Sequence, residues 1–241
     1  MKRFFLTLAV AALSLGTRAQ QLSPDSISMY DEIQKIEVVA TRATSKTPVA
    51  YTNLSREDIA RNNYGLDIPS LLALTPSMIA TNETGIGIGG TSMRLRGTDA
   101  TRLNVTINGM PLNNPDSHST YWYDTPDLIS SVGSLQLQRG VGTSTAGTGA
   151  FGASLNMTSA PISAEFAGRA SMSYGSFNTA KQELSLASGL LGGHWAVEGR
   201  LSHVSSDGYV DRASSDLASY MFQAGYYKGG TMVKLLSFGG K

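Results

Sequence analysis

Apolar and polar residues alternate along three short stretches in the middle of the chain. These stretches are residues 93–96, 103–107 and 135–138, which read MRLR, LNVTI and LQLQ. A period of two is typical of strands that bury one face. Asn108-Gly109 follows the second stretch, and both residues accept the positive φ of a tight two-residue turn. The pattern therefore predicts a small sheet over residues 93–159.

Local signals predict further elements before this sheet. Residues 49–54 favour a strand. Ser55, with Asp58 three residues later, approximates a capping box and predicts a helix over residues 56–62.

Two more helices are expected at prolines. Asp67 and Pro69 begin a helix that ends near Pro76. The apolar residues of this helix are Leu71, Leu72 and Leu74. Thr125-Pro126-Asp127 combines a capping residue, a first-turn proline and an acid, and it predicts a short helix through Ser131.

From residue 165 onward the pattern changes to longer strands joined by alternately short and long connections. The predicted strands are residues 169–175, 179–190, 194–203, 219–228 and 231–238. In the third strand, Trp195, Val197 and Leu201 alternate with Glu198, Arg200 and Ser202. One face of such strands suits lipid and the other a polar interior.

The other strands of this part follow the pattern to different degrees. In the first strand, Ala170, Met172 and Tyr174 alternate with polar residues, and in the fourth Tyr220, Phe222 and Tyr226 form an aromatic face. The fifth does not alternate cleanly, because Lys234 stands among Met232 and Leu236.

The N-terminus has the organisation of a secretory signal peptide over residues 1–19. Lys2 and Arg3 precede the apolar run 4–15, and Thr17-Arg18-Ala19 places small residues at a cleavage site. The run is too short to span a bilayer as a helix, and a buried N-terminal helix is the alternative. We therefore expect export, with a mature chain that begins at Gln20.

Composition excludes several functional classes. The net charge is +1 and only 15% of residues are charged, so there is no polybasic surface for nucleic acid. The absence of cysteine excludes disulfides, thiol catalysis and thiolate metal sites. The three histidines, His118, His194 and His203, are scattered, and spacing assembles no catalytic set. We expect no enzyme and no cofactor.

Gly85-Ile86-Gly87-Ile88-Gly89-Gly90 contains the GxGxxG pattern of dinucleotide folds. That motif requires a strand before it and a helix after it. Here no strong strand precedes the pattern, and a strand rather than a helix follows. A loop whose glycines permit tight packing is the better interpretation.

The order of these elements resembles the plug domain of TonB-dependent outer-membrane receptors. The matching features are a strand ending in Arg96-Gly97, a strand ending in Asn108-Gly109, a short helix, and a strand ending in Arg139-Gly140. A Ser/Gly-rich crossing, GVGTSTAGTGAFG, and a last strand, ASLNMTS, follow. The resemblance implies an α+β plug over residues 48–160, with the first antiparallel strands of an incomplete transmembrane β-barrel over residues 165–241.

The resemblance also assigns the segment before the plug. Residues 20–47 would be an N-terminal tail that carries the TonB box, Ile36, Glu37, Val38, Val39, Ala40 and Thr41. This box adds as a strand to TonB, which works with ExbB and ExbD. The residues alone equally allow an ordinary first strand of the plug.

In the resembled family, the arginines of the two Arg-Gly motifs lock the plug to barrel glutamates. Arg96 and Arg139 would take this role, because a bidentate arginine–carboxylate pair is firm yet breakable. The partner glutamates would lie beyond Lys241. The alternative is two solvated arginines at strand ends.

Substrate is expected at the loops of one end of the plug. The candidate residues are Gly87, Gly89, Arg102, Asp116, His118, Tyr121, Trp122 and Tyr123. Loops on a rigid scaffold commonly bind ligands, and aromatic rings give contact area at low entropic cost. The alternative is that Tyr121 and Trp122 pack against the barrel wall. Asp116 and His118 are too few for a metal site, so none is expected.

These features together predict a receptor in the outer membrane of a Gram-negative bacterium, embedded in its lipid. Its cargo would be a scarce nutrient, most commonly an iron chelate of the siderophore type. Five strands cannot close a barrel, which around a plug needs about 22. We therefore expect an N-terminal fragment, and the alternative function is a transport-incompetent plug that binds only ligand or TonB.

Overall fold

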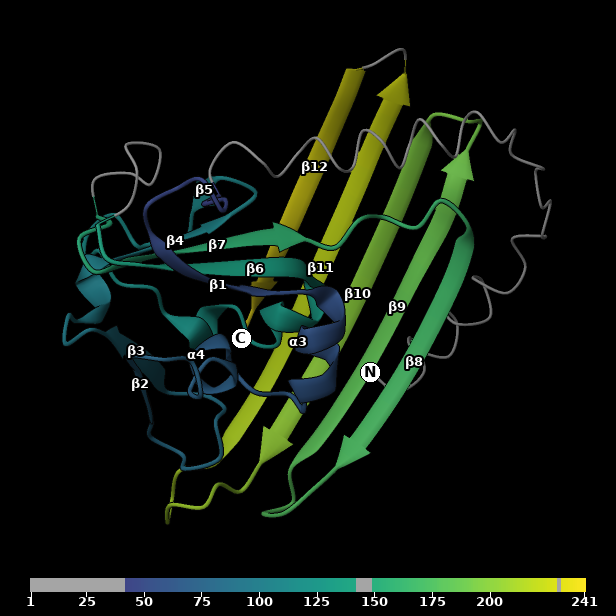
Figure 1. The fold of residues 1–241 in the computed structure, drawn as a ribbon. Coiled ribbons are helices and arrows are strands. Elements are labelled where there is room, and N and C mark those ends of the chain that lie inside the picture. The colour runs from purple at the N-terminus through teal and green to yellow at the C-terminus, as the bar shows by residue number, and fades with distance from the viewer. Residues whose placement is uncertain (1–41, 142–148, 229–230) are drawn as a thin grey trace.

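The computed structural model describes residues 42–141, 149–228 and 231–241. They form a mixed sheet with short helices and, beside it, a separate antiparallel sheet (Figure 1). This arrangement confirms the predicted fold class, an α+β part followed by antiparallel strands that do not close. The predicted signal peptide and TonB box lie outside the described residues. None of the helices among the described residues is long or apolar enough to cross a membrane.

The elements of the first part, in chain order, are β1 (Ala50–Leu54), α3 (Arg56–Asn62), α4 (Ile68–Leu71), β2 (Met78–Asn82), β3 (Thr91–Leu95), η1 (Ala100–Arg102), β4 (Leu103–Ile107), β5 (Met110–Pro111), η2 (Trp122–Asp124), η3 (Leu128–Ser131), β6 (Val132–Arg139) and β7 (Ala153–Ser159). Those of the second part are β8 (Phe166–Tyr174), β9 (Ala180–Leu191), β10 (Trp195–Ser206), β11 (Ser215–Lys228) and β12 (Thr231–Gly240).

The mixed sheet has the strand order β1-β6-β7-β4-β5, with β4 and β7 parallel and the other pairs antiparallel. Its registered rows explain the alternation in the sequence. Val105, Leu155 and Leu137 lie in one row and are each 1% exposed. The helices α3 and α4 and the β2–β3 hairpin cover this face and complete one apolar core.

The other face of β6 and β7 is polar and nevertheless buried. Gln136 and Gln138 of β6 stand opposite Asn156 and Ser154 of β7, and all four are at most 5% exposed. Buried polar groups require hydrogen-bonding partners, so this face must be covered by other polar atoms of the chain.

The local turn and capping signals are confirmed. Ser55 and Asp58 form a reciprocal capping box at the start of α3. Asn108 and Gly109 both have positive φ and connect β4 to β5.

Two predicted helices differ from the structure. α4 ends at Leu71, not near Pro76, because the chain leaves the helix in successive tight turns and Leu74 is 99% exposed. The helix expected from Thr125 begins only at Leu128, as a 3₁₀ helix. Asp127 has a left-handed φ of 52°, which a helix cannot contain.

A strand also precedes the glycine-rich stretch, contrary to expectation. β2 pairs with β3 in a separate two-stranded sheet. The sequence of β2, MIATN, does not alternate between apolar and polar residues, because Ile79 is apolar and yet 61% exposed.

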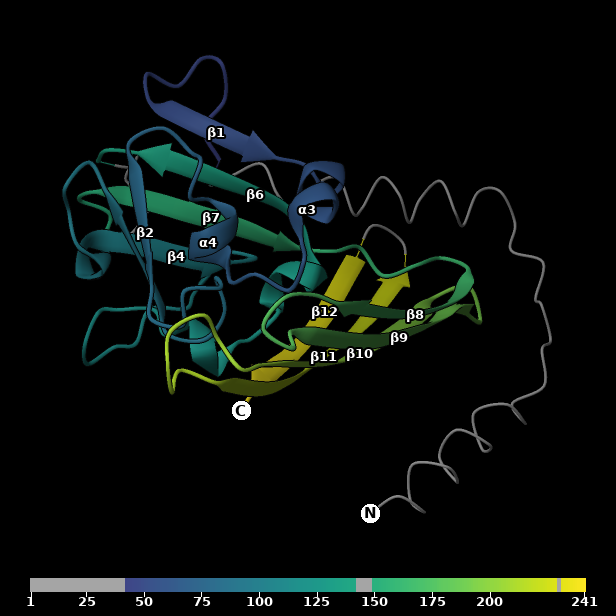
Figure 2. The ribbon, with the colours of Figure 1, turned by 90° about the horizontal axis from the view of Figure 1, so that it is seen from below.

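The antiparallel sheet is a simple meander in the order β12-β11-β10-β9-β8. The predicted strands are all present, although β11 begins four residues early, at Ser215. In β10, Arg200 and Ser202 are buried on the side of the mixed sheet, whereas Leu201 is 52% exposed on the other side. The predicted polar and apolar faces are therefore confirmed in this strand. Figure 2 shows the antiparallel sheet as a layer along one side of the mixed sheet.

β12 alternates more regularly than its sequence suggested. Val233 and Leu235 are about 60% exposed. Lys234 points the other way, and its ammonium donates to the Ser159 hydroxyl at 2.7 Å. Leu236 and Phe238 pack against the core of the mixed sheet. The face of β12 that points toward the mixed sheet thus carries both apolar residues and one lysine. The apolar residues contact the core, and the lysine contacts the Ser159 hydroxyl at the end of β7.

The two sheets are joined by a buried group of charges centred on Asp127, whose side chain is fully buried. The Lys181 ammonium of β9 donates to Asp127 Oδ1 at 2.6 Å. The Arg200 guanidinium of β10 donates to Asp127 Oδ2 at 2.7 Å and to its carbonyl at 3.0 Å. Ser202 donates to the same carboxylate at 2.6 Å. We call Asp127, Lys181, Arg200 and Ser202 the charge cluster.

Burial and the neighbouring charges act in opposite directions on the pKa of Asp127. Burial acts to raise the pKa of this carboxyl, but the positive charges of Lys181 and Arg200 outweigh it. The pKa lies below its usual value, so Asp127 is ionised at neutral pH. The two sheets therefore meet through a compensated ion pair rather than through an isolated charge.

We expect Leu135→Ala to lower the free energy of unfolding of the N-terminal part by about 2–5 kcal/mol, because Leu135 is completely buried. Leu74→Ala is the matched control, with an expected change below about 0.5 kcal/mol, because Leu74 is exposed. Urea unfolding followed by Trp122 fluorescence, in a Trp195→Phe background, measures both. Equal urea midpoints for the two variants would contradict the proposed core.

Asp127→Asn should weaken the docking of the two sheets by about 3–5 kcal/mol, since it leaves Arg200 buried without a carboxylate partner and Lys181 with only Glu183, at 3.4 Å. Asp216→Asn is the control, because Asp216 is 81% exposed and its pair with His203 contributes at most about 1 kcal/mol. The same unfolding assay separates the two. An Asp127→Asn protein as stable as Asp216→Asn would rule out a structural role for the charge cluster.

Candidate functional site

The connection between β2 and β3, which we call the glycine loop (residues 83–90), is closed by its own polar groups. The Glu83 amide donates to the Gly90 carbonyl at 2.9 Å. The Thr84 hydroxyl and the Asn82 side-chain amide donate to the Ile88 carbonyl at 2.6 and 3.2 Å. The loop joins two strands and leads into no helix, so it lacks the geometry of a phosphate-binding turn.

Gly87 and Gly89 are required for close packing within this loop. Both have positive φ, 85° and 89°. A Cβ atom at Gly87 would lie 2.7 Å from a methyl carbon of Leu66, and one at Gly89 would lie 2.8 Å from the Ser215 hydroxyl. The two glycines thus face protein atoms in this structure.

The glycine loop contacts the connection between β10 and β11. The amides of Tyr209 and Val210 donate to the Thr84 carbonyl at 2.9 and 3.2 Å. The Tyr209 ring would lie 3.0 Å from a Cβ atom at Gly85, and it meets Phe177 edge to face with ring centroids 5.5 Å apart. Tyr209 is 68% exposed, and with Phe177 it forms an aromatic surface beside the glycine loop.

Asp67 lies beneath the glycine loop and caps α4. Its amide donates to the Gly87 carbonyl at 2.9 Å, and its carboxylate accepts from the Thr91 hydroxyl at 2.9 Å. Burial raises the pKa of Asp67 to about 6, although hydrogen bonds from Thr91 and the Gly89 backbone oppose the change. Asp67 is therefore a titratable group directly under the loop.

The aromatic loop, residues 113–124, divides into buried and exposed rings. Trp122 is 3% exposed and belongs to the core of the mixed sheet, which favours packing over ligand contact for this ring. Tyr121 and Tyr123 are 38% and 46% exposed, with ring centroids 5.6 Å apart. Asn113 holds the start of the loop, because its side chain bonds the Val105 amide and the Leu103 carbonyl, each at 2.8 Å.

Asp116 and His118 lie within this loop, where Asn114 accepts hydrogen bonds from the Asp116 amide. His118 has a left-handed φ of 56°. In the described part of the chain, no three carboxylate or imidazole side chains are placed to share a metal ion.

Arg96 and Arg139 lie together at the end of the mixed sheet that points away from the antiparallel sheet. Figure 2 shows β6 running from the antiparallel sheet toward this end. A Cβ atom at Gly140 would lie 3.1 Å from Arg96 Nη1. Arg139 donates to the Thr52 hydroxyl at 2.6 Å, and among the described residues neither arginine forms an ion pair. Arg102 is exposed and is the last residue of η1.

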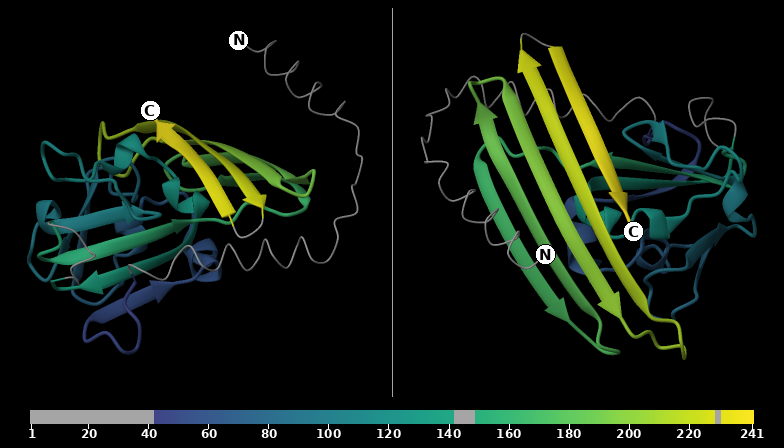
Figure 3. Two further views of the ribbon diagram at one scale, coloured as in Figure 1. Left: turned by 90° about the horizontal axis from the view of Figure 1, so that it is seen from above. Right: turned by 180° about the vertical axis from the view of Figure 1, so that it is seen from behind.

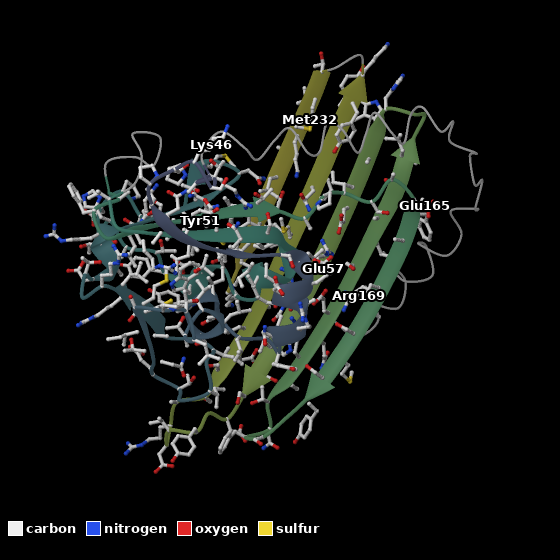
Figure 4. The ribbon with its side chains drawn as sticks, in the orientation of Figure 1. Lys46, Tyr51, Glu57, Glu165, Arg169 and Met232 are labelled. Atoms are coloured by element: carbon white, nitrogen blue, oxygen red, sulfur yellow. The ribbon has the colours of Figure 1, made fainter. Side chains whose placement is uncertain are left out.

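The contact between the two parts also encloses a polar cleft of about 210 Å³. Its lining includes Arg56 of α3, Asn63 directly after that helix, and Arg169, Lys181 and Glu183 of β8 and β9. Figure 4 shows the side chains of α3, with Glu57 labelled, on the side of the molecule that faces the strand carrying Arg169. This part of the contact is polar and loosely packed.

Sequence reasoning missed the charge cluster and the Tyr209 contact. Asp127 was interpreted only as a helix-start acid, and Lys181 only as part of a strand. Two features of the sequence point to these contacts. Arg200 lies on the polar face of an alternating strand, which indicates a partner inside, and the connection that carries Tyr209 is long enough to reach another part of the chain.

Comparison with solved structures finds similar folds in outer-membrane receptors. The ferripyoverdine receptor of Pseudomonas aeruginosa has a TM-score of 0.66 at 16% identity, over 83% of this chain and 26% of that one. The siderophore receptor PirA of Acinetobacter baumannii has a TM-score of 0.60 at 14% identity, over 79% and 31%. The copper transporter OprC has a TM-score of 0.61 at 19% identity, over 82% and 32%. This chain thus spans about a quarter to a third of the length of these proteins.

A comparison with curated protein sequences finds no match. The family model of the TonB-dependent receptor plug domain, in contrast, matches residues 43–154. This match covers β1 through the start of β7, including both Arg-Gly motifs and the glycine loop. Residues 43–154 of this chain therefore form a plug domain of the TonB-dependent receptor type.

Proposed function

We propose that this chain forms the N-terminal part of a TonB-dependent outer-membrane transporter for a scarce nutrient. The observation that carries the proposal is the plug domain docked by the charge cluster on the polar face of an unclosed antiparallel sheet. The opposite face of that sheet exposes Leu201, Tyr220, Val233 and Leu235. A polar inner face and an apolar outer face suit strands that separate lipid from a filled interior.

The proposed organisation follows from this role. Residues 1–19 direct export, residues 36–41 are the TonB box, residues 48–160 are the plug, and residues 165–241 begin the barrel wall. Trp195 and Tyr226, whose rings lie 4.6 Å apart at one end of the sheet, belong to an aromatic girdle at the membrane interface. The β9–β10 connection and the β11–β12 connection, the two shortest in this sheet, then lie on the periplasmic side.

Substrate meets the opposite end, where the glycine loop touches the connection that carries Tyr209. Tyr121, Tyr123 and His118 of the aromatic loop are further proposed contacts. An iron chelate of the siderophore type is the favoured cargo. Two of the similar solved structures, a siderophore receptor and a ferripyoverdine receptor, support this class, whereas a third is a copper transporter.

Arg96 and Arg139 are proposed to lock the plug on its far side. They lie away from the described antiparallel sheet, so their partners would be carboxylates on other strands of the barrel. The charge cluster holds the near side with the charges exchanged. Here the plug supplies the carboxylate, and the antiparallel sheet supplies the two cations.

TonB would act on the chain through the box. A strand added to the edge of TonB is held by main-chain hydrogen bonds, and it transmits a pull from ExbB and ExbD at the inner membrane to the plug.

Val38→Pro should lower the affinity of the full-length protein for the purified C-terminal domain of TonB by at least about tenfold, because proline removes a strand donor. Ile27→Pro, in the same tail but outside the TonB box, is the control and should bind normally. Calorimetry measures both affinities. Equal binding by the two variants would refute the assignment of residues 36–41 as the TonB box.

Tyr121→Ala combined with Tyr123→Ala should weaken binding of the best ligand from a panel of iron(III) catecholate and hydroxamate chelates, by about tenfold, without loss of stability. Trp122→Ala should instead reduce stability by about 3–5 kcal/mol, because this ring lies in the core. Fluorescence titration and urea unfolding separate the two effects. An unchanged dissociation constant for the tyrosine variant would remove this loop from the substrate site.

A further inference from the structure

The first described residues of the chain are bound to the buried polar face of β6 and β7. We call Arg42 and Ala43 the strap. Figure 3 shows that the N-terminal strand β1, which follows the strap after a short turn, lies along the edge of the mixed sheet. The strap is therefore the point at which the N-terminal tail joins the folded plug.

The Gln136 side chain bonds both the backbone amide and the backbone carbonyl of the strap residue Ala43. Its Oε1 accepts from the Ala43 amide at 2.7 Å, and its Nε2 donates to the Ala43 carbonyl at 2.9 Å. The same side chain accepts from Gln138 at 2.8 Å and donates to Asn53 at 2.7 Å. A glutamine amide offers two donors and two acceptor positions, so Gln136 is fully satisfied only while the strap is in place.

Arg42 provides a second fastening on the same face. Its Nη2 donates to the Thr158 hydroxyl at 2.8 Å, to the Ser134 carbonyl at 3.1 Å and to the Asn156 carbonyl at 3.4 Å. None of these acceptors carries a charge. The fastening is consequently made of ordinary hydrogen bonds, each worth about 1 kcal/mol, or somewhat more from a charged donor.

The strap and the charge cluster are connected through one strand. Gln136 lies in the middle of β6, and η3 leads directly from Asp127 into the start of that strand. A pull on the tail is therefore delivered through the strap to β6, and from there to Lys181 and Arg200 of the antiparallel sheet. β1, which pairs only with the edge of β6, is protected while the strap holds.

We propose that the strap is the release point of the plug: it yields first when the N-terminal tail is pulled, before β1 separates from β6. This inference rests on the proposed function for the origin of the pull. The charge cluster remains closed during this step, because it is buried and ionic whereas the strap is held by uncharged acceptors.

Hydrogen exchange of the full-length protein, followed by mass spectrometry over residues 42–47, tests the fastening. Gln136→Ala should increase exchange of the Ala43 amide by at least about tenfold. Gln182→Ala, the same change at an exposed position of β9, should leave it unchanged. Arg42→Ala should act like Gln136→Ala without altering the interior of the sheet. Unchanged exchange of the Ala43 amide in both Gln136→Ala and Arg42→Ala would overturn the proposal.

Mechanical pulling tests the order of events. The chain has no cysteine, so Ser23→Cys gives a unique attachment point in the tail. We expect a first extension of about 30 Å, the length of the eight residues from Arg42 to Val49, which include the strap, at roughly 3.6 Å each. Gln136→Ala should abolish this step. A first step that already includes β1 would overturn the proposal, whereas loss of TonB binding would contradict only the proposed function.

Discussion

The ion pairs of Asp127 with Lys181 and Arg200 constrain the whole arrangement. A carboxylate with no exposed surface is tolerated only with its counter-charges in place, so the plug and the antiparallel sheet must dock in one position. Lys181 and Arg200 come from neighbouring strands, and a shift of β10 by one residue would turn Arg200 to the outer face. Strand register and docking therefore support each other. The left-handed backbone of Asp127 is part of the same constraint, because it turns both the carboxylate and the carbonyl toward Arg200.

Features that depend on a few neighbouring residues were predictable from the sequence. The period-two pattern located β3, β4 and β6, because alternate side chains of these strands enter one apolar core. The Ser55–Asp58 capping box and the Asn108-Gly109 turn are set by their own residues and appear as expected. The inward position of Arg200 also followed from alternation, although its partner did not.

Features that depend on distant residues could not be read in this way. Asp127 lies 54 residues from Lys181 and 73 from Arg200, and no local pattern connects them. Trp122 illustrates the same difficulty, since its neighbours in sequence are exposed tyrosines while its own ring completes the core. α4 ended early because the turns after Leu72 replace helical bonds before Pro76 is reached. In each case tertiary contacts, rather than propensity, decided the outcome.

β6 is the strand on which these contacts converge. Its start is fixed to the antiparallel sheet through η3, its middle holds the strap through Gln136, and its end is tied to β1 through Arg139 and Thr52. Moving the plug as one rigid body would break the charge cluster, at a cost of about 3–5 kcal/mol for an uncompensated buried charge. Releasing the strap breaks only hydrogen bonds of about 1 kcal/mol each, which water can replace one at a time. The lower barrier therefore lies at the strap, and a pull on the tail separates the strap from β6 while the charge cluster keeps the plug docked on the antiparallel sheet.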